Sequence, residues 1–280
     1  MASLGENRYG KSRVRVMKVI RNETHHEMKE WNVCVLLHGD FETCFTTGDN
    51  SKILPTDTMK NTDYYLARES SAAALEVFAT ELVAFLLADN PQVSKASVEI
   101  EEKSWKAMLI DGQPHATTYQ LGGPELQTAE VVQQRGEAAQ ISSGIDGLVI
   151  LKTTRSAFTG YIKNAQTTLP ESTDRIFGTR ATVVWEYLEK PNDYAAIRAL
   201  ALETLLKVFA EHDSLSVQHT LYDMGKAMLA AVPQLARVKL TMPNLHCNLV
   251  DLSRFGQTNP NQIFVPIDEP HGYIEAVIER

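Results

Sequence analysis

Two stretches of fifteen residues say most about the fold: LLADNPQVSKASVEI, residues 86–100, and MLAAVPQLARVKLTM, residues 228–242. They align without a gap at an offset of 142 residues, about half of the 280-residue chain. In each, an apolar helix-like run ends at a Pro-Gln pair and gives way to the alternation of an amphipathic strand. The matched pairs are Leu87 with Leu229, Pro91 with Pro233, Gln92 with Gln234, Lys95 with Arg237 and Val98 with Leu240. The match favours a duplicated helix–strand unit, although five positions in fifteen do not exclude chance.

Three further patterns of apolar spacing indicate helices, over residues 71–87, 192–210 and 215–231. Pro191 and the pair Asn192-Asp193 mark a capped start for the second of them. β-branched and aromatic alternation predicts strands over residues 14–20, 31–37, 97–101, 148–151, 182–188 and 237–242. This mixture predicts an α+β fold, with antiparallel sheets that are solvated on one face and covered by helices on the other.

The middle of the chain is interpreted as a connection between the two halves. Residues 113–140 contain Pro114, Gly122, Gly123 and Pro124 and then a polar run to Arg135, which is typical of a hairpin followed by a linker. We therefore place a domain boundary near Ala139, which gives units of residues 1–139 and 140–280.

The composition excludes some partners. Apolar residues make up 44% of the chain and charged residues 22%, as in an ordinary soluble globular protein. A formal net charge of −8 argues against non-specific nucleic-acid binding, which needs a basic face. The one dense basic stretch, KSRVRVMK over residues 11–18, alternates polar and apolar residues, so we interpret it as the solvated face of a strand.

No sequence feature favours export or membrane insertion. No apolar run approaches the roughly 18 residues of a membrane span, and the N-terminal MASLGENRYGKSR lacks the apolar core of a secretory signal. The C-terminal IEAVIER lacks the Ser-Lys-Leu address of peroxisomal proteins. Cys34, Cys44 and Cys247 are too few and too scattered for a disulfide framework or a structural zinc site. We expect a cytoplasmic protein with no membrane contact.

Several common catalytic signatures are missing from the sequence. No Gly-x-Gly-x-x-Gly motif follows a strand, and there is no Gly-x-Ser-x-Gly elbow. The eight histidines form no i,i+4 pair with a helical glutamate and have no metal-finger spacing. Nucleotide and metal chemistry are both disfavoured, and we predict no metal site.

Four local motifs, spread over both halves, together resemble the urate oxidase family. They are Tyr9-Gly10-Lys11, TDTMKNT at residues 56–62, QTTL at 166–169 continuing to Thr173-Asp174-Arg175, and MPNLH at 242–246. Ser216-Val217-Gln218 and Ser156-Ala157-Phe158 add to the match. Their order and spacing are similar to the family from about residue 8 to residue 272, and the commonest pattern is broken notably at Leu245.

The resemblance implies a fold and an assembly. The family has two tandem tunnelling-fold (T-fold) units in each chain, which would explain the duplication. Four such chains form a homotetramer whose sheets close into a barrel around a central tunnel. The active sites lie at subunit interfaces, with two of the motifs from one chain and the rest from its neighbour.

The resemblance also implies the residues that hold urate, a flat purine anion. Arg175 would grip one edge of the ring with its planar guanidinium, and the Gln218 amide would match the mixed donors and acceptors of another edge. Phe158 would stack on the ring. Taken alone, Arg175 suits a salt bridge with Asp174 or a nearby glutamate better than a binding role, and only the family resemblance reverses this preference. An isolated phenylalanine is usually a core residue.

The remaining binding residues implied by the family are Thr56, Asp57, Val217 and Asn244. Thr56 and Asp57 have the sequence of a helix N-cap, and the backbone N–H groups at such a helix start can also point at an anion. Asn244 would hold the oxygen molecule or a water above the urate plane.

Lys11, Thr56 and His246 resemble the proton relay of the family. Burial lowers the pKa of a lysine, and a base needs a lowered pKa. Taken alone, Lys11 suits an exposed basic residue and His246 a hydrogen-bonded core histidine. The implied reaction turns urate, O2 and water into 5-hydroxyisourate and hydrogen peroxide, the first step of urate degradation toward allantoin. It needs no cofactor, because deprotonated urate is electron-rich enough to reduce oxygen itself.

Two other functions fit a fold of this kind. One is a non-catalytic purine-binding protein, which the presence of Lys11, Thr56 and His246 disfavours. The other is a T-fold enzyme acting on pterins, which commonly anchors its substrate with a glutamate and often needs zinc. The pairing of Arg175 with Gln218 favours urate over a pterin.

Overall fold

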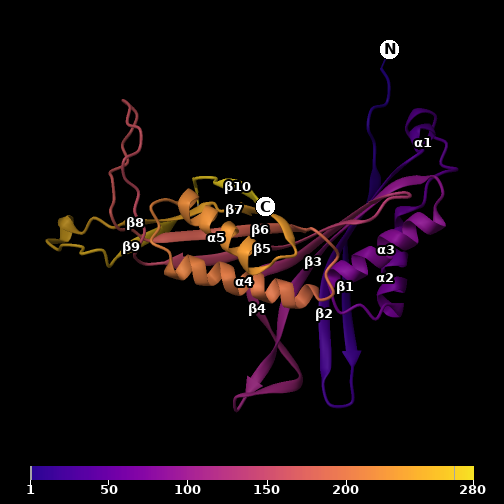
Figure 1. The fold of residues 1–280 in the computed structure, drawn as a ribbon, viewed down its shortest axis with the longest axis horizontal. Helices are drawn as coiled ribbons and strands as arrows, with labels where there is room; N and C mark the ends of the chain where they lie inside the picture. The colour runs from indigo at the N-terminus through magenta and orange to yellow at the C-terminus, as the bar shows by residue number, and fades with distance from the viewer. Residues whose placement is uncertain (1, 268) are drawn as a thin grey trace. The chain divides into compact units, whose positions relative to one another are not determined.

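The structure is a computed structural model that describes residues 2–267 and 269–280. It separates into two compact units, Met1–Gly144 and Ile145–Arg280. Their helices and strands are labelled in Figure 1. No helix within the described residues is long and apolar enough to cross a membrane.

The first unit has one antiparallel sheet with helices packed against it. Its strands follow the order β1-β2-β3-β4, and neighbouring strands are antiparallel. Helix α2 contacts β1 while α3 contacts β3 and β4, so the helices cover the sheet (Figure 1). The bounds are β1 Tyr9–Arg21, β2 His26–Gly39, α1 Glu42–Thr46, α2 Thr56–Glu69, α3 Leu75–Asp89, β3 Val93–Ile110 and β4 Gln113–Gln134.

Alternating side chains build the core of this unit. In β1, Val14 and Val16 are buried whereas Arg13 and Arg15 are exposed, because successive residues of a strand face opposite sides of the sheet. Trp31 of β2 stacks on Phe78 of α3 with 4.8 Å between the ring centroids. Burial of such large apolar side chains holds the helices on the sheet.

The second unit has a similar construction. Its strands follow the order β5-β6-β7-β10, and β8 leaves this path to pair with β6 and β9. Helices α4 and α5 contact each other, and α5 also packs on β7 and β10 (Figure 1). The bounds are β5 Gln140–Lys152, β6 Phe177–Tyr187, α4 Tyr194–Glu211, α5 Val217–Ala231, β7 Leu235–Thr241, β8 Asn244–Leu249, the 3-10 helix Ser253–Phe255, β9 Phe264–Ile267 and β10 Glu275–Glu279.

The two units repeat one helix–turn–strand element at the offset seen in the sequence. Helices α3 and α5 both have 15 residues, and their first residues, Leu75 and Val217, are matched at that offset. An arginine closes each element: Arg135 donates to the carbonyls of Leu87, Asn90 and Val93. Arg280 donates to the carbonyls of Leu229, Val232 and Leu235, which are the matched positions.

The predicted helices and strands are confirmed, with shifted ends. Helix α4 begins after Asp193, whose carboxylate accepts from the Ala196 N–H at 2.9 Å, as the cap signal predicted. Helix α3 begins at Leu75, four residues later than the predicted start, and in the segment before it the Ala72 N–H donates to the Ser70 hydroxyl at 2.9 Å. The α+β class with antiparallel pairing is therefore correct.

The hairpin and linker predicted over residues 113–140 are wrong. Most of this segment is the long strand β4, which pairs with β3 from Ile110 opposite Gln113 to Lys95 opposite Gln134. The turn is Asp111-Gly112, where both residues have positive φ. Asp-Gly between two strands is a strong hairpin signal, and it places the turn just before the segment for which the hairpin was predicted.

Candidate active site

The predicted site residues fall into two groups, one in each unit, and the structure describes each group by itself. In the first unit, Lys11 follows Gly10 near the start of β1, where the strands pack very closely. A Cβ atom on Gly10 would lie 1.8 Å from the Val35 carbonyl oxygen, so only glycine fits. The strand register shifts between Lys11 and Val14, and Arg13 has a φ of 59°. Residues 9–11, which are all half-buried, lie before this bulge and outside the alternation of buried and exposed residues seen at Val14 to Met17.

Tyr9 ties the start of β1 to the segment that precedes α2. Its hydroxyl donates to the Leu54 carbonyl at 3.1 Å and accepts from the Leu54 N–H at 2.8 Å. The ring of Tyr9 also meets Phe41 edge to face, with 4.8 Å between centroids. These contacts fix the backbone that leads into Thr56 relative to the strand that carries Lys11.

Thr56 and Asp57 begin helix α2, but the predicted side-chain cap is wrong. Pro55 occupies the cap position and makes no side-chain hydrogen bond, so the helix starts one residue too early for Thr56 to act as cap. Asp57 instead accepts hydrogen bonds from Lys60 and Asn61 further along the helix. Both Thr56 and Asp57 are exposed.

The charge on Lys11 reaches the first turn of α2. The pKa of Asp57 lies below its ordinary value mainly because Lys60 hydrogen-bonds to its carboxylate. The positive charge of Lys11 adds a smaller effect in the same direction. The charges of Lys11 and Asp57 are therefore close enough to interact.

In the second unit, Arg175 and Phe158 lie together. The guanidinium of Arg175 is 5.1 Å from the centroid of the Phe158 ring. Backbone bonds hold the two segments: Arg175 donates its N–H to the Ser156 carbonyl at 2.8 Å, and Phe158 pairs with Ser172. Tyr161 stacks on Phe158 at 4.8 Å between centroids. Phe158 is thus part of a partly exposed aromatic cluster rather than of the core.

Arg175 does not form the alternative salt bridge with Asp174. The Asp174 carboxylate accepts from the Thr154 hydroxyl at 2.7 Å and from the Ser156 N–H at 3.3 Å. Within residues 2–267 and 269–280, no carboxylate lies at ion-pair distance from Arg175. Burial lowers the pKa of Arg175, a guanidinium that remains charged throughout the physiological range. It is a half-buried cation without an anionic partner in the described chain.

Arg175 also lines a small cavity with Asn244 and His246. Strand β8 carries Asn244 and His246 and pairs with β6 through Thr179 and Gly178, which brings β8 beside the segment that follows Arg175. The cavity has a volume of about 20 Å³. A single water molecule needs roughly 10–15 Å³ by this measure, so the cavity can hold one small polar molecule. Leu245, between the two polar residues, turns toward Gly178.

Val217 and Gln218 form the first turn of α5. Ser216 caps this helix by accepting from the His219 N–H at 3.1 Å. Val217 is buried and Gln218 is exposed. The preceding Ser214 accepts from the Ala157 N–H at 2.7 Å, which joins the start of α5 to the segment that carries Phe158.

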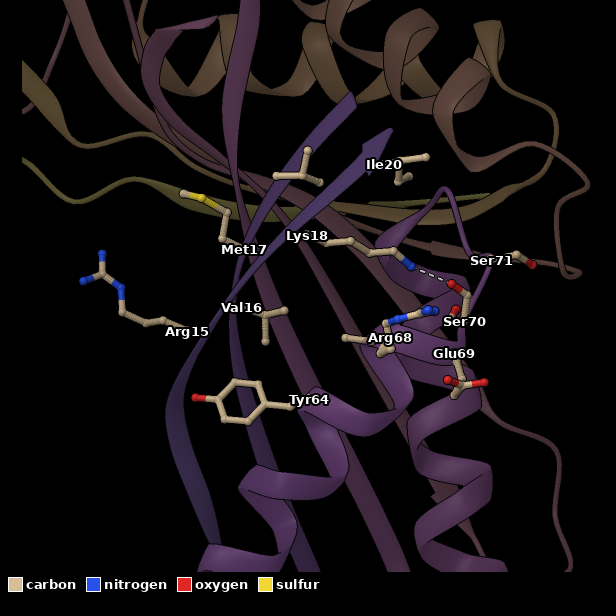
Figure 2. Close-up of a pocket in the computed structure, with 12 residues that line it drawn as sticks. Arg15, Val16, Met17, Lys18, Ile20, Tyr64, Arg68, Glu69, Ser70 and Ser71 are labelled. Atoms are coloured by element: carbon tan, nitrogen blue, oxygen red, sulfur yellow. Dashed lines mark hydrogen bonds between the residues drawn. The ribbon is translucent and has the colours of Figure 1, made fainter. Parts of the chain in front are cut away.

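A broader groove lies beside β1 and the second half of α2 (Figure 2). Its volume is about 770 Å³, and its lining includes the cations Arg15, Lys18 and Arg68. Lys18 donates to the Ser70 carbonyl across it (Figure 2). None of the predicted site residues lines this groove, so it is separate from the candidate site.

The structure brings together one group of possible metal ligands that the sequence did not suggest. His212, His219 and Asp223 offer ligand atoms that all lie within 4.8 Å of one another. The eight histidines have no i,i+4 glutamate partner on the same helix, but the i,i+4 partner of His219 is an aspartate, Asp223. His212 joins them only through the packing of α4 on α5, which spacing alone does not show.

Known proteins resemble this chain over nearly its whole length. The profile of the family named Uricase matches residues 7–132 and 141–275. Uricase from Arthrobacter globiformis is 40% identical over 282 residues, which cover 99% of this chain and 90% of that protein. Uricase from Dictyostelium discoideum is 36% identical over 283 residues, which cover 100% and 98%.

Solved structures agree with the sequence comparison. The crystal structure of uricase from Arthrobacter globiformis superposes with a TM-score of 0.94 at 39% identity, covering 100% of this chain and 96% of that chain. Urate oxidase from Bacillus sp. TB-90 shares the fold, with a TM-score of 0.86 at 23% identity. The predicted α+β tunnelling fold is thereby confirmed. By sequence and by structure, the chain belongs to the uricase family.

Proposed function

We propose that this chain is a urate oxidase that converts urate, O2 and water into 5-hydroxyisourate and hydrogen peroxide. Urate gives up two electrons, which reduce O2 to peroxide, and water supplies the oxygen that the purine gains. The observation that carries the proposal is the half-buried Arg175, which has no carboxylate partner in the described chain and lies over Phe158 beside Asn244 and His246. Membership of the uricase family supports the substrate.

Arg175 and Phe158 bind the purine in this proposal. A planar guanidinium donates two parallel hydrogen bonds to an edge of carbonyl and ring-nitrogen acceptors, and it offsets the negative charge of urate. Partial burial strengthens that attraction because fewer waters compete for the charge. The face of Phe158 packs against the flat ring. Since Asp174 is engaged by Thr154 and Ser156, it does not compete with urate for Arg175.

Gln218, Val217 and Asn244 complete the contacts with substrate and oxygen. The exposed amide of Gln218 both donates and accepts, which matches a purine edge that presents both kinds of group. Val217, which the family resemblance also implies, precedes it at the start of α5. Asn244 borders the small cavity, whose size suits one O2 or one water held by the amide.

Lys11, Thr56 and His246 move the protons. Lys11 acts on the Thr56 hydroxyl, and His246 passes protons onward from the purine. The nearness of the Lys11 charge to Asp57 supports a place for the lysine at the first turn of α2. Because Pro55 provides no side-chain cap, the N–H groups of that turn remain available to an anionic ligand, with Thr56 and Asp57 beside it.

The complete site needs residues of both groups. We propose a homotetramer in which Lys11, Thr56 and Asp57 of one chain meet Phe158, Arg175, Gln218 and Asn244 of its neighbour. The reaction uses no cofactor, because the electrons come from deprotonated urate and the protein contributes deprotonation, positioning and charge.

The test is oxidation of urate by chelator-treated protein. The ultraviolet absorbance of urate should fall in air and stay constant under argon, with peroxide released only in air. A matched sample of Arg175→Ala controls for contaminating oxidases. If urate binds but is not consumed in air, the chain is a non-catalytic purine-binding protein. Activity that returns only with added zinc or copper would exclude the cofactor-free reaction.

A further inference from the structure

Three metal-ligating side chains converge where α4 ends and α5 begins. His212 Nε2 lies 2.9 Å from a carboxylate oxygen of Asp223, and His219 Nε2 lies 3.8 Å from the same oxygen. The two imidazole rings meet at 4.4 Å between centroids. Zinc holds nitrogen and oxygen donors at about 2.0–2.2 Å, so neighbouring donors of one ion lie roughly 3–3.5 Å apart. The three groups therefore need only small side-chain rotations to share an ion.

Two features fix these side chains before any ion arrives. His219 and Asp223 are four residues apart on α5, which puts them on the same face of the helix. His212 follows α4, and its backbone N–H donates to the Val208 carbonyl at 2.9 Å. The backbone of His212 is thereby held where α4 ends.

Thr220 provides the outer hydrogen bond that metal-binding histidines usually have. Its hydroxyl is 3.1 Å from His212 Nδ1, and it lies 3.4 Å from the Ser216 carbonyl oxygen. If Thr220 donates to Ser216, it accepts from His212 Nδ1–H, which leaves the Nε2 lone pair facing Asp223. The 2.9 Å contact is also the length of a hydrogen bond, so a proton on Nε2 that donates to Asp223 gives way to the ion when the ion binds.

The cluster is open on one side. The side chains of His212, His219 and Asp223 are 13%, 41% and 33% exposed. Beside His212 and Asp223 lies a shallow cavity of about 410 Å³, walled by Val208 and Ala227 and bordered by Glu211 and Lys226. An ion can enter from this side and keep water in its remaining coordination positions.

We propose that His212, His219 and Asp223 bind a divalent transition-metal ion of the zinc class. Two imidazoles and one carboxylate suit Zn²⁺, Co²⁺, Ni²⁺ or Cu²⁺, whereas Mg²⁺ and Ca²⁺ prefer sites made of oxygen alone. None of the three residues belongs to the proposed urate site, so the ion does not take part in the reaction.

The place of the cluster links it to substrate binding. His219 follows Gln218 directly, and the His219 N–H is the group that Ser216 caps at the start of α5. An ion bound by both His212 and His219 would link the first turn of α5 to the end of α4. If Gln218 holds urate as proposed above, metal binding should change the affinity for purine. This second step rests on the proposed function, whereas the metal site does not.

The binding test uses the chelator-treated full chain with Zn²⁺ or Co²⁺ as the probe. Calorimetry with Zn²⁺ should give one site per chain. Bound Co²⁺ should produce visible absorption, which should disappear when Zn²⁺ displaces the Co²⁺. His219→Gln and Asp223→Asn should each weaken binding at least tenfold. The control is His115→Gln, which changes an exposed histidine on β4 of the other unit and should leave binding unchanged. His219→Gln keeps the contact of His212 with Asp223, so it separates loss of a ligand from loss of the fold.

Equal affinity and stoichiometry in the parent, His219→Gln and Asp223→Asn would overturn the metal site, as would the absence of saturable binding to the parent. The coupling is tested by the affinity for a xanthine with and without Zn²⁺. Zinc should change that affinity in the parent and not in His219→Gln. An unchanged affinity in zinc-loaded parent would overturn the coupling and leave the metal site standing. If the parent chain binds zinc but does not turn over urate, the proposed function is wrong and the metal site is unaffected.

Discussion

Arg175 lies with its guanidinium 5.1 Å from the centroid of the Phe158 ring, and within the described residues no carboxylate pairs with it. A cation over an aromatic face gains about 0.5–1 kcal/mol at an exposed site, far less than a buried ion pair can provide. A half-buried guanidinium whose aromatic contact is so weak is suited to reversible binding of an anionic ligand. The pair thus offers both an edge contact and a stacking face to one flat ligand.

Replacing Arg175 should weaken substrate binding. Arg175→Ala removes a charged set of hydrogen bonds worth about 1.5–3 kcal/mol, which is roughly a ten- to 150-fold loss of affinity for urate or a xanthine. Arg175→Lys should recover only part of it, because an ammonium cannot form the two-pronged contact. Binding is measured by calorimetry with a non-reactive xanthine, and Arg180→Ala, an exposed arginine of β6, is the control. Unchanged affinity in Arg175→Ala would remove Arg175 from the binding site.

Lys11 should affect the reaction rather than binding. In the proposed relay it acts on protons that move only while urate reacts, so Lys11→Met should lower the turnover rate and leave the affinity for a xanthine nearly intact. Stopped-flow absorbance with saturating urate measures the rate, and calorimetry measures the affinity. Lys95→Met, which changes a lysine of β3 outside the proposed site, is the control. Loss of xanthine binding with normal turnover of bound urate would make Lys11 a structural residue.

The shared site predicts complementation between two inactive chains. Thr56→Ala and Arg175→Ala should each be inactive, and mixed tetramers should recover part of the activity because some interfaces carry neither change. Subunit exchange is verified by mass spectrometry of the intact assembly. Demonstrated mixed tetramers without any activity would argue that Thr56 and Arg175 serve one site within the same chain.

Asp63 should make the fold less stable at neutral pH than in mild acid. This residue of α2 is fully buried, and neither carboxylate oxygen has a hydrogen-bond partner in the described chain. Burial raises its pKa from 3.8 to about 7, because the charged form loses its hydration. The folded state therefore retains a proton that the unfolded state releases, and this contribution to stability falls as pH rises from about 4 to 7.

Asp63→Asn should abolish this part of the pH dependence. The amide resembles the protonated acid in shape but does not ionise, so the variant should gain about 1–3 kcal/mol over the parent at pH 8 and clearly less at pH 5. Denaturant unfolding at both values measures the difference, with Asp89→Asn, an exposed aspartate at the end of α3, as the control. A gain of equal size at pH 5 and pH 8 would show that ionisation of Asp63 is not the cause.

The helices, strands and helix cap that depend on neighbouring residues could be predicted from local sequence patterns. The offset between the two Pro-Gln turns matches helices α3 and α5 in the structure, because the apolar periodicity of the helices and the alternation of the strands are both local features. Asp193 caps α4 as expected, since a cap depends on a few neighbouring residues. The glycines and prolines of residues 113–124 wrongly indicated a hairpin and linker. In the structure they lie in β4 near its first residues and at a shift in its register with β3, where a strand can accept them.

The candidate site was accessible mainly through the family resemblance. Nothing in the spacing of Phe158, Arg175 and Asn244 brings them together, since their proximity comes from the pairing of β6 with β8 and from the loop that carries Phe158. The prediction of a side-chain cap at Thr56 was wrong because Pro55 occupies the cap position. The cluster of His212 with His219 and Asp223 depends on the packing of two helices, which a single sequence does not reveal.

The most direct measurement follows urate, O2 and peroxide together in one chelator-treated sample. If deprotonated urate supplies both electrons to oxygen, an oxygen electrode, urate absorbance and a peroxide assay should give one O2 consumed and one peroxide formed for each urate lost. Catalase should return half of the oxygen, as expected for free peroxide. Urate loss without peroxide, or with oxygen consumption that departs from one per urate, would contradict the central claim that this chain is a cofactor-independent urate oxidase.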